Sequence, residues 1–154
     1  MKALFCGTFD PITLGHINII ERIAALFDEV VVGVFENSSK NCMFTDKERL
    51  SLVTEATSDM QNVSAVLCGG LVSKYARENG IDVIVKGVRN ARDYDYELEM
   101  AGVNRMLTGC ETFLLPADKD TELLSSTMVR ILHKNGESVE KYVPGCVLLA
   151  LKNK

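Results

Sequence analysis

The sequence predicts an α/β protein built on a five-stranded parallel sheet, doubly wound, with the strand order 3-2-1-4-5. Short apolar segments alternate along the chain with segments in which apolar residues recur at helical spacing. The segment Glu29–Phe35 is rich in valine and apolar on both faces, which is typical of a parallel strand covered by helices on both sides. The connections are short, which favours right-handed crossovers within one sheet. We therefore expect a Rossmann-like arrangement with helices on both faces.

The first half of the chain supplies three strands and the helices between them. Residues 3–6 form an apolar strand. The apolar stripe of the helix that follows consists of Ile17, Ile20, Ile23, Ala24 and Phe27. Thr45 and Glu48 form a capping box, which predicts the start of another helix after the second strand. Residues 63–67 predict the third strand, and residues 71–79 predict a short helix that ends at a glycine.

The second half continues the alternation and ends in helices. The elements predicted here are a strand at residues 83–85, a helix at 91–107, a strand at 112–115 and a helix at Ser126–Lys134. Residues 86–89 are expected to form the turn after the fourth strand. Pro144 is expected to begin a last helix, since proline is favoured at the first helical position. The chain contains no linker and no internal repeat, so residues 1–154 are predicted to be a single domain.

Composition and charge exclude several classes of protein. The net charge of −4 argues against a nucleic-acid partner bound by a broad basic surface. No apolar run approaches the length of about 20 residues that a membrane-spanning helix needs. We expect a cytoplasmic protein without membrane or nucleic-acid partners, because no signal peptide is present and the cysteines lack disulfide or metal-ligand spacing. These cysteines, interpreted as reduced thiols, are Cys6, Cys42, Cys68, Cys110 and Cys146.

The segments with unusual composition all follow strands. They are residues 7–16 (GTFDPITLGH), 37–40 (NSSK), 69–70 (GG), 86–89 (KGVR) and 117–125. In a doubly wound sheet, ligands bind outside the carboxyl ends of the strands, where the strand order reverses. The first and fourth strands would flank that crevice, so the basic side chains His16, Lys40, Lys86 and Arg89 would converge there. Residues 7–16 also lead into a helix N-terminus, which favours phosphate. The pattern predicts a site for a diphosphate or triphosphate.

Other phosphate and catalytic chemistries are excluded by what the sequence lacks. Neither a P-loop motif nor a G-x-G-x-x-G fingerprint occurs. No His, Cys or carboxylate cluster has metal-ligand spacing, so no metal ligands are predicted. The chain has two histidines and no base beside a serine, which argues against a Ser-His-Asp hydrolase. Cationic positioning of phosphates, without a covalent intermediate, is the chemistry that remains.

Two segments carry a resemblance to a known superfamily. Residues 13–16 (TLGH) resemble the T/H-x-G-H signature of the nucleotidylyltransferases, and residues 124–130 (LSSTMVR) resemble their I-S-S-T-x-x-R signature. The match is more detailed with the bacterial phosphopantetheine adenylyltransferases and covers essentially the whole chain. Further matching positions are residues 7–13, Ser39, Lys40, Met43, Phe44, Arg49, residues 86–89 and residues 94–97.

This resemblance implies an activity with its substrates. The family joins 4′-phosphopantetheine to the adenylyl group of ATP and releases dephospho-coenzyme A and pyrophosphate, in coenzyme A biosynthesis. The substrate phosphate attacks the α-phosphorus in line, and Mg²⁺ accompanies ATP rather than being held by protein ligands. The resemblance also implies a homohexamer, with coenzyme A as a feedback ligand.

The resemblance further implies roles for individual residues. His16, Lys40, Arg89 and Thr8 would be the catalytic group, with His16 on the α-phosphate and Thr8 on the attacking phosphate. The nucleotide would contact Thr8, Phe9, His16, Gly87, Val88, Arg89, Glu97, Thr121, Glu122, Leu123, Leu124, Ser125, Ser126 and Thr127. Phosphopantetheine would contact Thr8, Lys40, Val72 and Lys86.

This chain departs from the family pattern in places. Lys86 stands where many members have arginine, and lysine provides a point charge instead of a bidentate fork. The segment of residues 117–124 is one residue longer than expected, which affects the alignment of residues 121–124. Two alternatives remain at this point: a nucleotidylyltransferase of the same fold that uses cytidine triphosphate or a nicotinamide mononucleotide acceptor, and a nucleotide-binding domain without catalysis.

Overall fold

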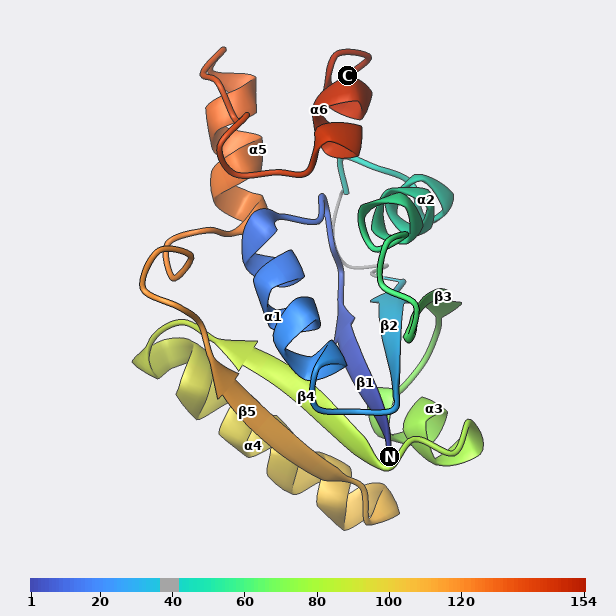
Figure 1. The fold of residues 1–154 in the computed structure, drawn as a ribbon. Coiled ribbons are helices and arrows are strands. Elements are labelled where there is room, and N and C mark those ends of the chain that lie inside the picture. Colours follow the sequence, from blue (N-terminus) through green and yellow to red (C-terminus); the bar gives the residue numbers. More distant parts are fainter. Residues whose placement is uncertain (37–41) are drawn as a thin grey trace.

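A computed structural model describes residues 1–36 and 42–154. It contains a parallel sheet with the strand order β3-β2-β1-β4-β5, which confirms the predicted fold and topology (Figure 1). The strands are β1 (Lys2–Gly7), β2 (Glu29–Phe35), β3 (Val63–Cys68), β4 (Val83–Val88) and β5 (Glu111–Pro116). The helices are α1 (Leu14–Ala24), α2 (Asp46–Ala56), α3 (Val72–Glu78), α4 (Ala91–Thr108), α5 (Ser126–Lys134) and α6 (Gly145–Leu151).

Helices cover both faces of the sheet, because alternate residues of the central strands point to opposite sides. Ala3 and Phe5 of β1 belong to the larger core, which contains apolar residues of α1, α2, α5 and α6. Leu4 and Cys6 belong to a second core, in which Ala76 of α3 is buried. Figure 1 shows α1 in front of the sheet and α5 and α6 beyond the carboxyl ends of the strands. The segment of residues 7–13 therefore enters a space bordered by later parts of the chain.

Strands β1 and β4 separate early, and this separation positions the site. Their register pairs only Ala3 with Val83 through Phe5 with Val85, whereas β1 pairs with β2 over six residues. Beyond Phe5, the carboxyl ends of β1 and β4 diverge at the point where the strand order reverses. The predicted crevice therefore lies between these two strands.

Strand β4 is longer than the sequence indicated. Lys86, Gly87 and Val88 were expected in a turn, but they belong to the strand and pair with Leu114, Leu115 and Pro116 of β5. The prediction of a turn at these three residues is wrong, because hydrogen-bonded pairing with β5 continues beyond the apolar run from which the strand was predicted. A Cβ at Gly87 would lie 3.3 Å from the Cγ1 atom of Ile19 in α1, so a glycine here permits close packing of strand on helix. Pro144 is the N-cap of α6, one residue before the helix begins.

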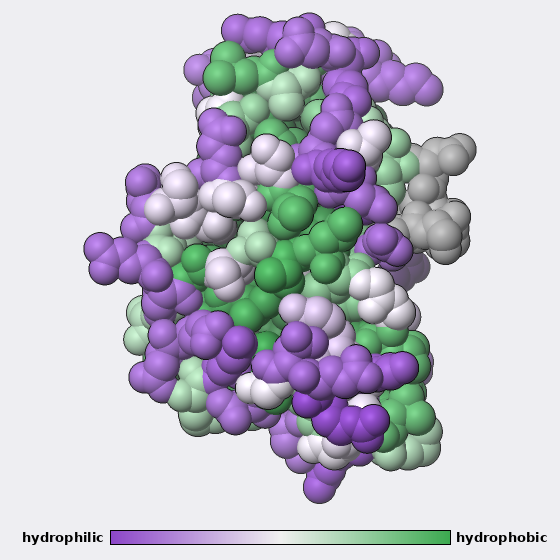
Figure 2. All heavy atoms as spheres, turned by 90° about the vertical axis from the view of Figure 1, so that its right-hand side faces the viewer, coloured by the Kyte–Doolittle hydropathy of each residue, from purple (hydrophilic) through white to green (hydrophobic). Residues whose placement is uncertain are grey.

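The surface of the chain carries exposed apolar residues at both edges of the sheet. On the side of the edge strand β3, Figure 2 shows hydrophobic surface in the middle of the face, with hydrophilic side chains around it. Leu67, in β3, and Leu71, just after it, are exposed. At the opposite edge, Asn104 is the one buried residue among the 18 residues of α4, so most of this helix faces outward. None of the helices in residues 1–36 and 42–154 is long and apolar enough to cross a membrane.

Candidate active site

The turn after β1 holds Phe9 in an unusual conformation. Its φ angle of 50° lies in the left-handed region, which few residues other than glycine adopt. The Phe9 ring packs nearly perpendicular to the His16 ring, with 5.1 Å between centroids. A Cβ at Gly7 would lie 3.2 Å from the tip of the Phe9 ring, so a side chain at Gly7 would crowd the ring. This packing gives the turn one preferred shape and presents His16 to the crevice.

The cap of helix α1 fixes the tautomer of His16. The Thr13 side chain accepts a hydrogen bond from the His16 backbone N–H, and the Thr13 backbone N–H donates to Nδ1 of His16 at 3.0 Å. Because Nδ1 is an acceptor here, the ring carries its proton on Nε2. Burial, with a smaller contribution from the Arg89 cation, lowers the pKa of His16 to about 4. His16 is therefore a neutral hydrogen-bond donor at neutral pH.

Asp10 connects the turn to the segment that follows β2. The Asp10 side chain is buried and accepts hydrogen bonds from the backbone N–H groups of Met43 and Phe44, both at 2.9 Å. Arg130 of α5 donates to the backbone carbonyl of Asp10, and its guanidinium lies 3.6 Å from the carboxylate. Two segments that are far apart in the sequence are thus held against the same turn.

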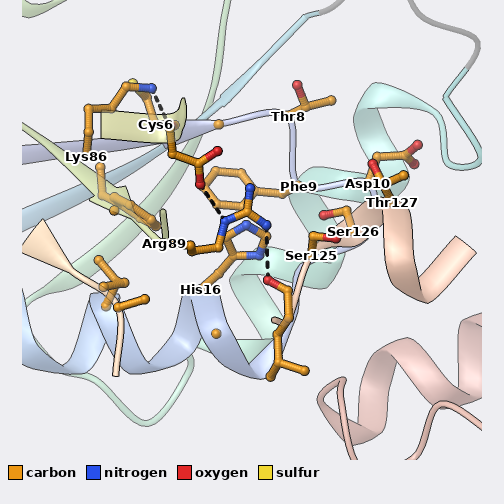
Figure 3. A pocket seen from close by; sticks show the side chains of 18 of the residues that line it. Cys6, Thr8, Phe9, Asp10, His16, Lys86, Arg89, Ser125, Ser126 and Thr127 are labelled. Atoms are coloured by element: carbon orange, nitrogen blue, oxygen red, sulfur yellow. Dashed lines mark hydrogen bonds and ion pairs between the residues drawn. The ribbon is translucent and has the colours of Figure 1, made fainter. Parts of the chain in front are cut away.

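Helix α5 also meets the turn through its first residues. Ser126 Oγ donates to the carbonyl of Pro11 at 2.8 Å, and Ser125 Oγ accepts from the backbone N–H of Met128 as the N-cap. Arg130 donates to Thr127 Oγ1 at 3.2 Å. The N-terminus of α5 therefore faces the crevice beside the turn, as Figure 3 shows for the three residues 125–127. Its amide groups and dipole favour an anion there.

The opposite wall of the crevice carries cations paired with carboxylates of α4. Lys86 Nζ lies 3.4 Å from Glu97 Oε1, and Arg89 Nε donates to Asp93 Oδ2 at 2.8 Å. Arg89 also donates to the carbonyl of Leu124 at 3.3 Å. In Figure 3 the Arg89 and His16 side chains lie together in the middle of the site.

Lys86 remains charged despite its burial. Burial alone would lower the pKa of Lys86, but ionised neighbours, the Glu97 carboxylate among them, outweigh it, and the net change is upward. Burial also raises the pKa of the Cys6 thiol, so this neighbour is neutral at neutral pH. The site thus combines permanent cations with a neutral imidazole donor, which suits the binding of a polyphosphate and the stabilisation of charge that develops on it.

These walls enclose a cleft of about 760 Å³, within the range of sites for small-molecule ligands. Most of the residues predicted from the sequence line it. They are Thr8, Phe9, His16, Lys86, Gly87, Arg89, Glu97, Thr121, Leu124, Ser125, Ser126 and Thr127. The structure therefore brings both signature segments and the end of β4 to one cavity.

Four predicted residues lie away from the cleft lining. Val88 is buried, and Val72 is half-buried against the second core. Glu122 and Leu123 are exposed, and Leu123 is 80% accessible. Thr121 and Leu124 on either side of them line the cleft, so the two side chains between them point to solvent. Lys40 lies outside the described residues.

The cleft also contains residues for which sequence reasoning gave no role. They are Asp10, Cys42, Arg92, Asp93, Tyr96 and Arg130. For Asp93 a signal existed, because it stands four residues before Glu97 on one face of a predicted helix and four residues after Arg89 in the preceding turn. Arg130 is the last residue of the second signature. No local pattern indicates that Asp10 would reach the amides of Met43 and Phe44.

Comparison with known proteins agrees with this geometry. The model of the cytidylyltransferase-like family matches residues 4–131. A phosphopantetheine adenylyltransferase from Cutibacterium acnes is 48% identical over 151 residues, with 98% of this chain and 96% of that protein covered. A phosphopantetheine adenylyltransferase from Leuconostoc citreum is 44% identical over 153 residues, with coverage of 99% and 97%.

A solved structure supports the fold. A candidate nicotinate-nucleotide adenylyltransferase from Vibrio parahaemolyticus superposes with a TM-score of 0.67 and covers 98% of this chain and 91% of its own. Its sequence identity is 19%, so this likeness concerns the architecture and not the substrate.

Proposed function

The chain belongs to the phosphopantetheine adenylyltransferases, within the cytidylyltransferase-like family, and we propose that it transfers the adenylyl group of ATP to 4′-phosphopantetheine. The products are dephospho-coenzyme A and pyrophosphate, in coenzyme A biosynthesis. One observation carries the proposal: a neutral His16 donor, the Arg89 and Lys86 cations and the N-terminus of α5 surround one cleft.

The reaction is an in-line displacement at phosphorus. A phosphate oxygen of 4′-phosphopantetheine attacks the α-phosphorus of ATP, and the bond from this phosphorus to the bridging oxygen of the β-phosphate breaks. Pyrophosphate leaves with that electron pair. Nε2–H of His16 donates to a non-bridging oxygen of the α-phosphate, where negative charge grows in the transition state. A ring that is already neutral needs no change of protonation to do this.

The two substrates occupy opposite ends of the cleft. Arg89 and the first amides of α5 bind the phosphates of ATP, and Glu97 faces the nucleotide from α4. Thr8 and Lys86 hold the phosphate of 4′-phosphopantetheine, because they lie where β1 and β4 diverge. The resemblance assigns Lys40, which lies outside the described residues, to the same phosphate. Val72 contacts the pantetheine arm if that arm extends toward α3, beyond the described cleft.

We propose, on the basis of the resemblance, that Mg²⁺ reaches the cleft with the nucleotide. Among residues 1–36 and 42–154, no three His, Cys, Asp or Glu side chains gather into a metal-binding group. Mg²⁺ commonly keeps several waters and binds substrate phosphates with few protein ligands. When bound, it would neutralise charge on the ATP phosphates. Asp93 and Glu97 are the carboxylates of α4 that line the cleft.

The same proposal includes an assembly of identical chains. The outer side of α4 and the edge strand β5 expose large apolar side chains: Leu98, Val103, Met106, Leu107 and Phe113. Large exposed apolar side chains on neighbouring elements are typical of an interface between chains. A homohexamer would bury it, and coenzyme A would act as a feedback ligand at the active site. All five cysteines are free thiols, which fits the reducing cytoplasm.

Pyrophosphate release tests the proposal with pairs of substrates. ATP and cytidine triphosphate are each combined with 4′-phosphopantetheine and with nicotinamide mononucleotide. We expect turnover with ATP and 4′-phosphopantetheine alone. Turnover with another acceptor and none with 4′-phosphopantetheine would exclude the proposed substrate. A rise in Tm with ATP but no pyrophosphate with any acceptor would indicate a binding domain without catalysis.

A further inference from the structure

Arg49 of α2 is a fully buried charged residue just outside the cleft. Its side chain has an exposed fraction of 0%. The guanidinium donates to the backbone carbonyl of Thr8, to the backbone carbonyl of Phe35 at 3.1 Å, and to the carboxylate of Asp46. Its Nε is buried without a hydrogen-bond partner among the described residues. A buried cation with one carboxylate partner is costly to the fold.

The acceptors of Arg49 come from segments that leave the sheet at the cleft. Thr8 follows the last residue of β1, and Phe35 is the last residue of β2. Asp46, in the first turn of α2, anchors the guanidinium from its own helix. One side chain therefore ties the carboxyl ends of two strands together. Arg49 does not line the cleft, so it acts through the residues that it contacts.

The other functional side chains have hydrogen-bond partners of their own besides this contact. His16 is oriented by Thr13, and Arg89 is held by Asp93 and by the Leu124 carbonyl. Thr8 is the cleft residue whose backbone Arg49 fixes directly, and it precedes Phe9, whose φ of 50° needs a firmly held turn. Loss of Arg49 would therefore disturb the Thr8 end of the cleft first.

We infer that Arg49 is a positioning residue that holds Thr8 toward the attacking phosphate of 4′-phosphopantetheine, an inference that rests on the proposed function. The guanidinium fixes the Thr8 carbonyl, and the peptide that follows sets the direction of the Thr8 side chain. A planar guanidinium reaches the Thr8 and Phe35 carbonyls and the Asp46 carboxylate together, whereas an ammonium group provides a single point of donation. The arrangement explains a buried arginine at a position where an aliphatic residue would pack.

The test compares Arg49→Lys and Arg49→Met with the wild-type chain. Misplacement of a substrate-orienting group by about 1 Å can reduce the rate about 100-fold, so we expect kcat/KM for 4′-phosphopantetheine to fall by that order. The Kd for ATP, measured by calorimetry without acceptor, changes much less, because Arg89 and the first amides of α5 still bind the phosphates. Arg49→Lys retains more activity than Arg49→Met, because its ammonium still reaches one carbonyl.

Asn62→Ala is the matched control for lost stability. Asn62 Nδ2 donates to the carbonyls of Ala24 and Phe27, at 2.8 and 3.0 Å, near the amino ends of the strands. Its substitution removes side chain-to-backbone hydrogen bonds at the end of the sheet away from the cleft. We expect a lower Tm with unchanged kcat/KM. The inference is overturned if the Arg49 variants lower Tm but keep the wild-type kcat/KM for 4′-phosphopantetheine.

Two further measurements cover the remaining outcomes. If the Arg49 variants do not fold, Asp46→Asn removes the anchor of the guanidinium at a partly exposed position, and a lower kcat/KM for 4′-phosphopantetheine is expected there too. If the wild-type chain itself releases no pyrophosphate, the proposed function fails. The position of Thr8 is then followed by the amide resonances of Thr8 and Phe9. Arg49→Lys shifts these resonances and Asn62→Ala does not, and equal spectra overturn the inference.

Discussion

The turn after β1 and the wall formed by β4 and α4 face each other across one cleft, but their polar groups have different partners in the free chain. In the turn, His16 is held by the Thr13 backbone, and the Asp10 carboxylate by the amides of Met43 and Phe44. In the wall, Lys86 and Arg89 pair with carboxylates of α4 and also donate to the backbone carbonyls of Cys6 and Leu124. Backbone amides hold the polar groups of the turn, whereas the cations of the wall have carboxylate partners that a phosphate can replace.

This difference separates two contributions to the reaction. The turn is organised before any substrate arrives, so its donors cost little rearrangement when charge develops. The cations of the wall must leave carboxylates in order to contact phosphates, so part of their interaction energy is offset by the pairs that they give up. We therefore expect changes in the turn to alter mainly kcat, and changes in the α4 carboxylates to alter mainly the affinity for ATP and its salt dependence.

The largest expected effect comes from His16→Ala. Removal of one preorganised donor to the developing charge commonly costs about 10²–10³-fold in kcat, while ATP still binds through the wall and through α5. Steady-state pyrophosphate release gives kcat, and calorimetry gives the Kd for ATP. Thermal unfolding checks that the variant is folded.

His133→Ala is the control for this comparison. His133 lies in the last turn of α5 and does not line the cleft. Its substitution should leave kcat at the wild-type value. If kcat of His16→Ala equals kcat of His133→Ala, His16 does not take part in the mechanism. The turn would then not supply the preorganised donor that we propose.

The fold could be predicted because its signals are local. The range Glu29–Phe35 and the helix Ser126–Lys134 have the predicted bounds, since an apolar run and a capped apolar stripe end at the same residues as the hydrogen bonding. Residues 86–88 were misassigned because their strand pairing depends on β5, which is distant in sequence. The composition of a strand does not show how far its pairing with a neighbouring strand extends.

The cleft residues that could be predicted are those within sequence motifs. His16 and Arg89 follow strands within recognisable segments, and both line the cleft. Asp10 and Arg49 form hydrogen bonds with backbone atoms of segments that are distant in sequence. Every residue offers a backbone carbonyl and almost every one an amide, so the sequence does not show which of them these side chains will contact. Residues 122 and 123 were assigned by resemblance to the family, and they precede the second signature, whose pattern does not specify which way the side chains of the loop point.

A smaller effect is expected from Asp93→Asn in the wall. This substitution removes the carboxylate that competes with phosphate for Arg89, across a pair with side-chain exposures of 35% and 24%. Partly exposed pairs contribute about 0.2–1 kcal/mol, so the KM for ATP should fall by about fivefold at most, with kcat retained. The measurement is KM at low and high salt, because the gain should shrink as salt screens the charges.

Asp95→Asn separates the ion pair from net charge. Asp95 is exposed on the same helix and does not line the cleft, and its substitution makes the same change in total charge. We expect an unchanged KM for ATP. If Asp95→Asn lowers KM as much as Asp93→Asn does, the wall acts through its overall field, and the proposed exchange of partners is wrong.

The pKa of His16 depends on both regions, because the ring belongs to the turn and the Arg89 cation belongs to the wall. Its pKa is lowered from 6.5 to about 4, first by burial and then by the Arg89 cation. As the pH falls from 6.5 toward 4, the unfolded chain takes up a proton on this ring that the folded chain does not, so the free energy of unfolding decreases. Arg89→Gln removes the cation, so the pKa of His16 rises and this acid-side loss becomes smaller. The ¹⁵N chemical shifts of the His16 ring, followed against pH, give its pKa in the wild-type chain and in Arg89→Gln. They also report whether the neutral ring carries its proton on Nε2. An ordinary pKa near 6.5 in the wild-type chain would mean that the turn is not organised as a neutral donor, and that it differs less from the wall than its hydrogen bonds indicate.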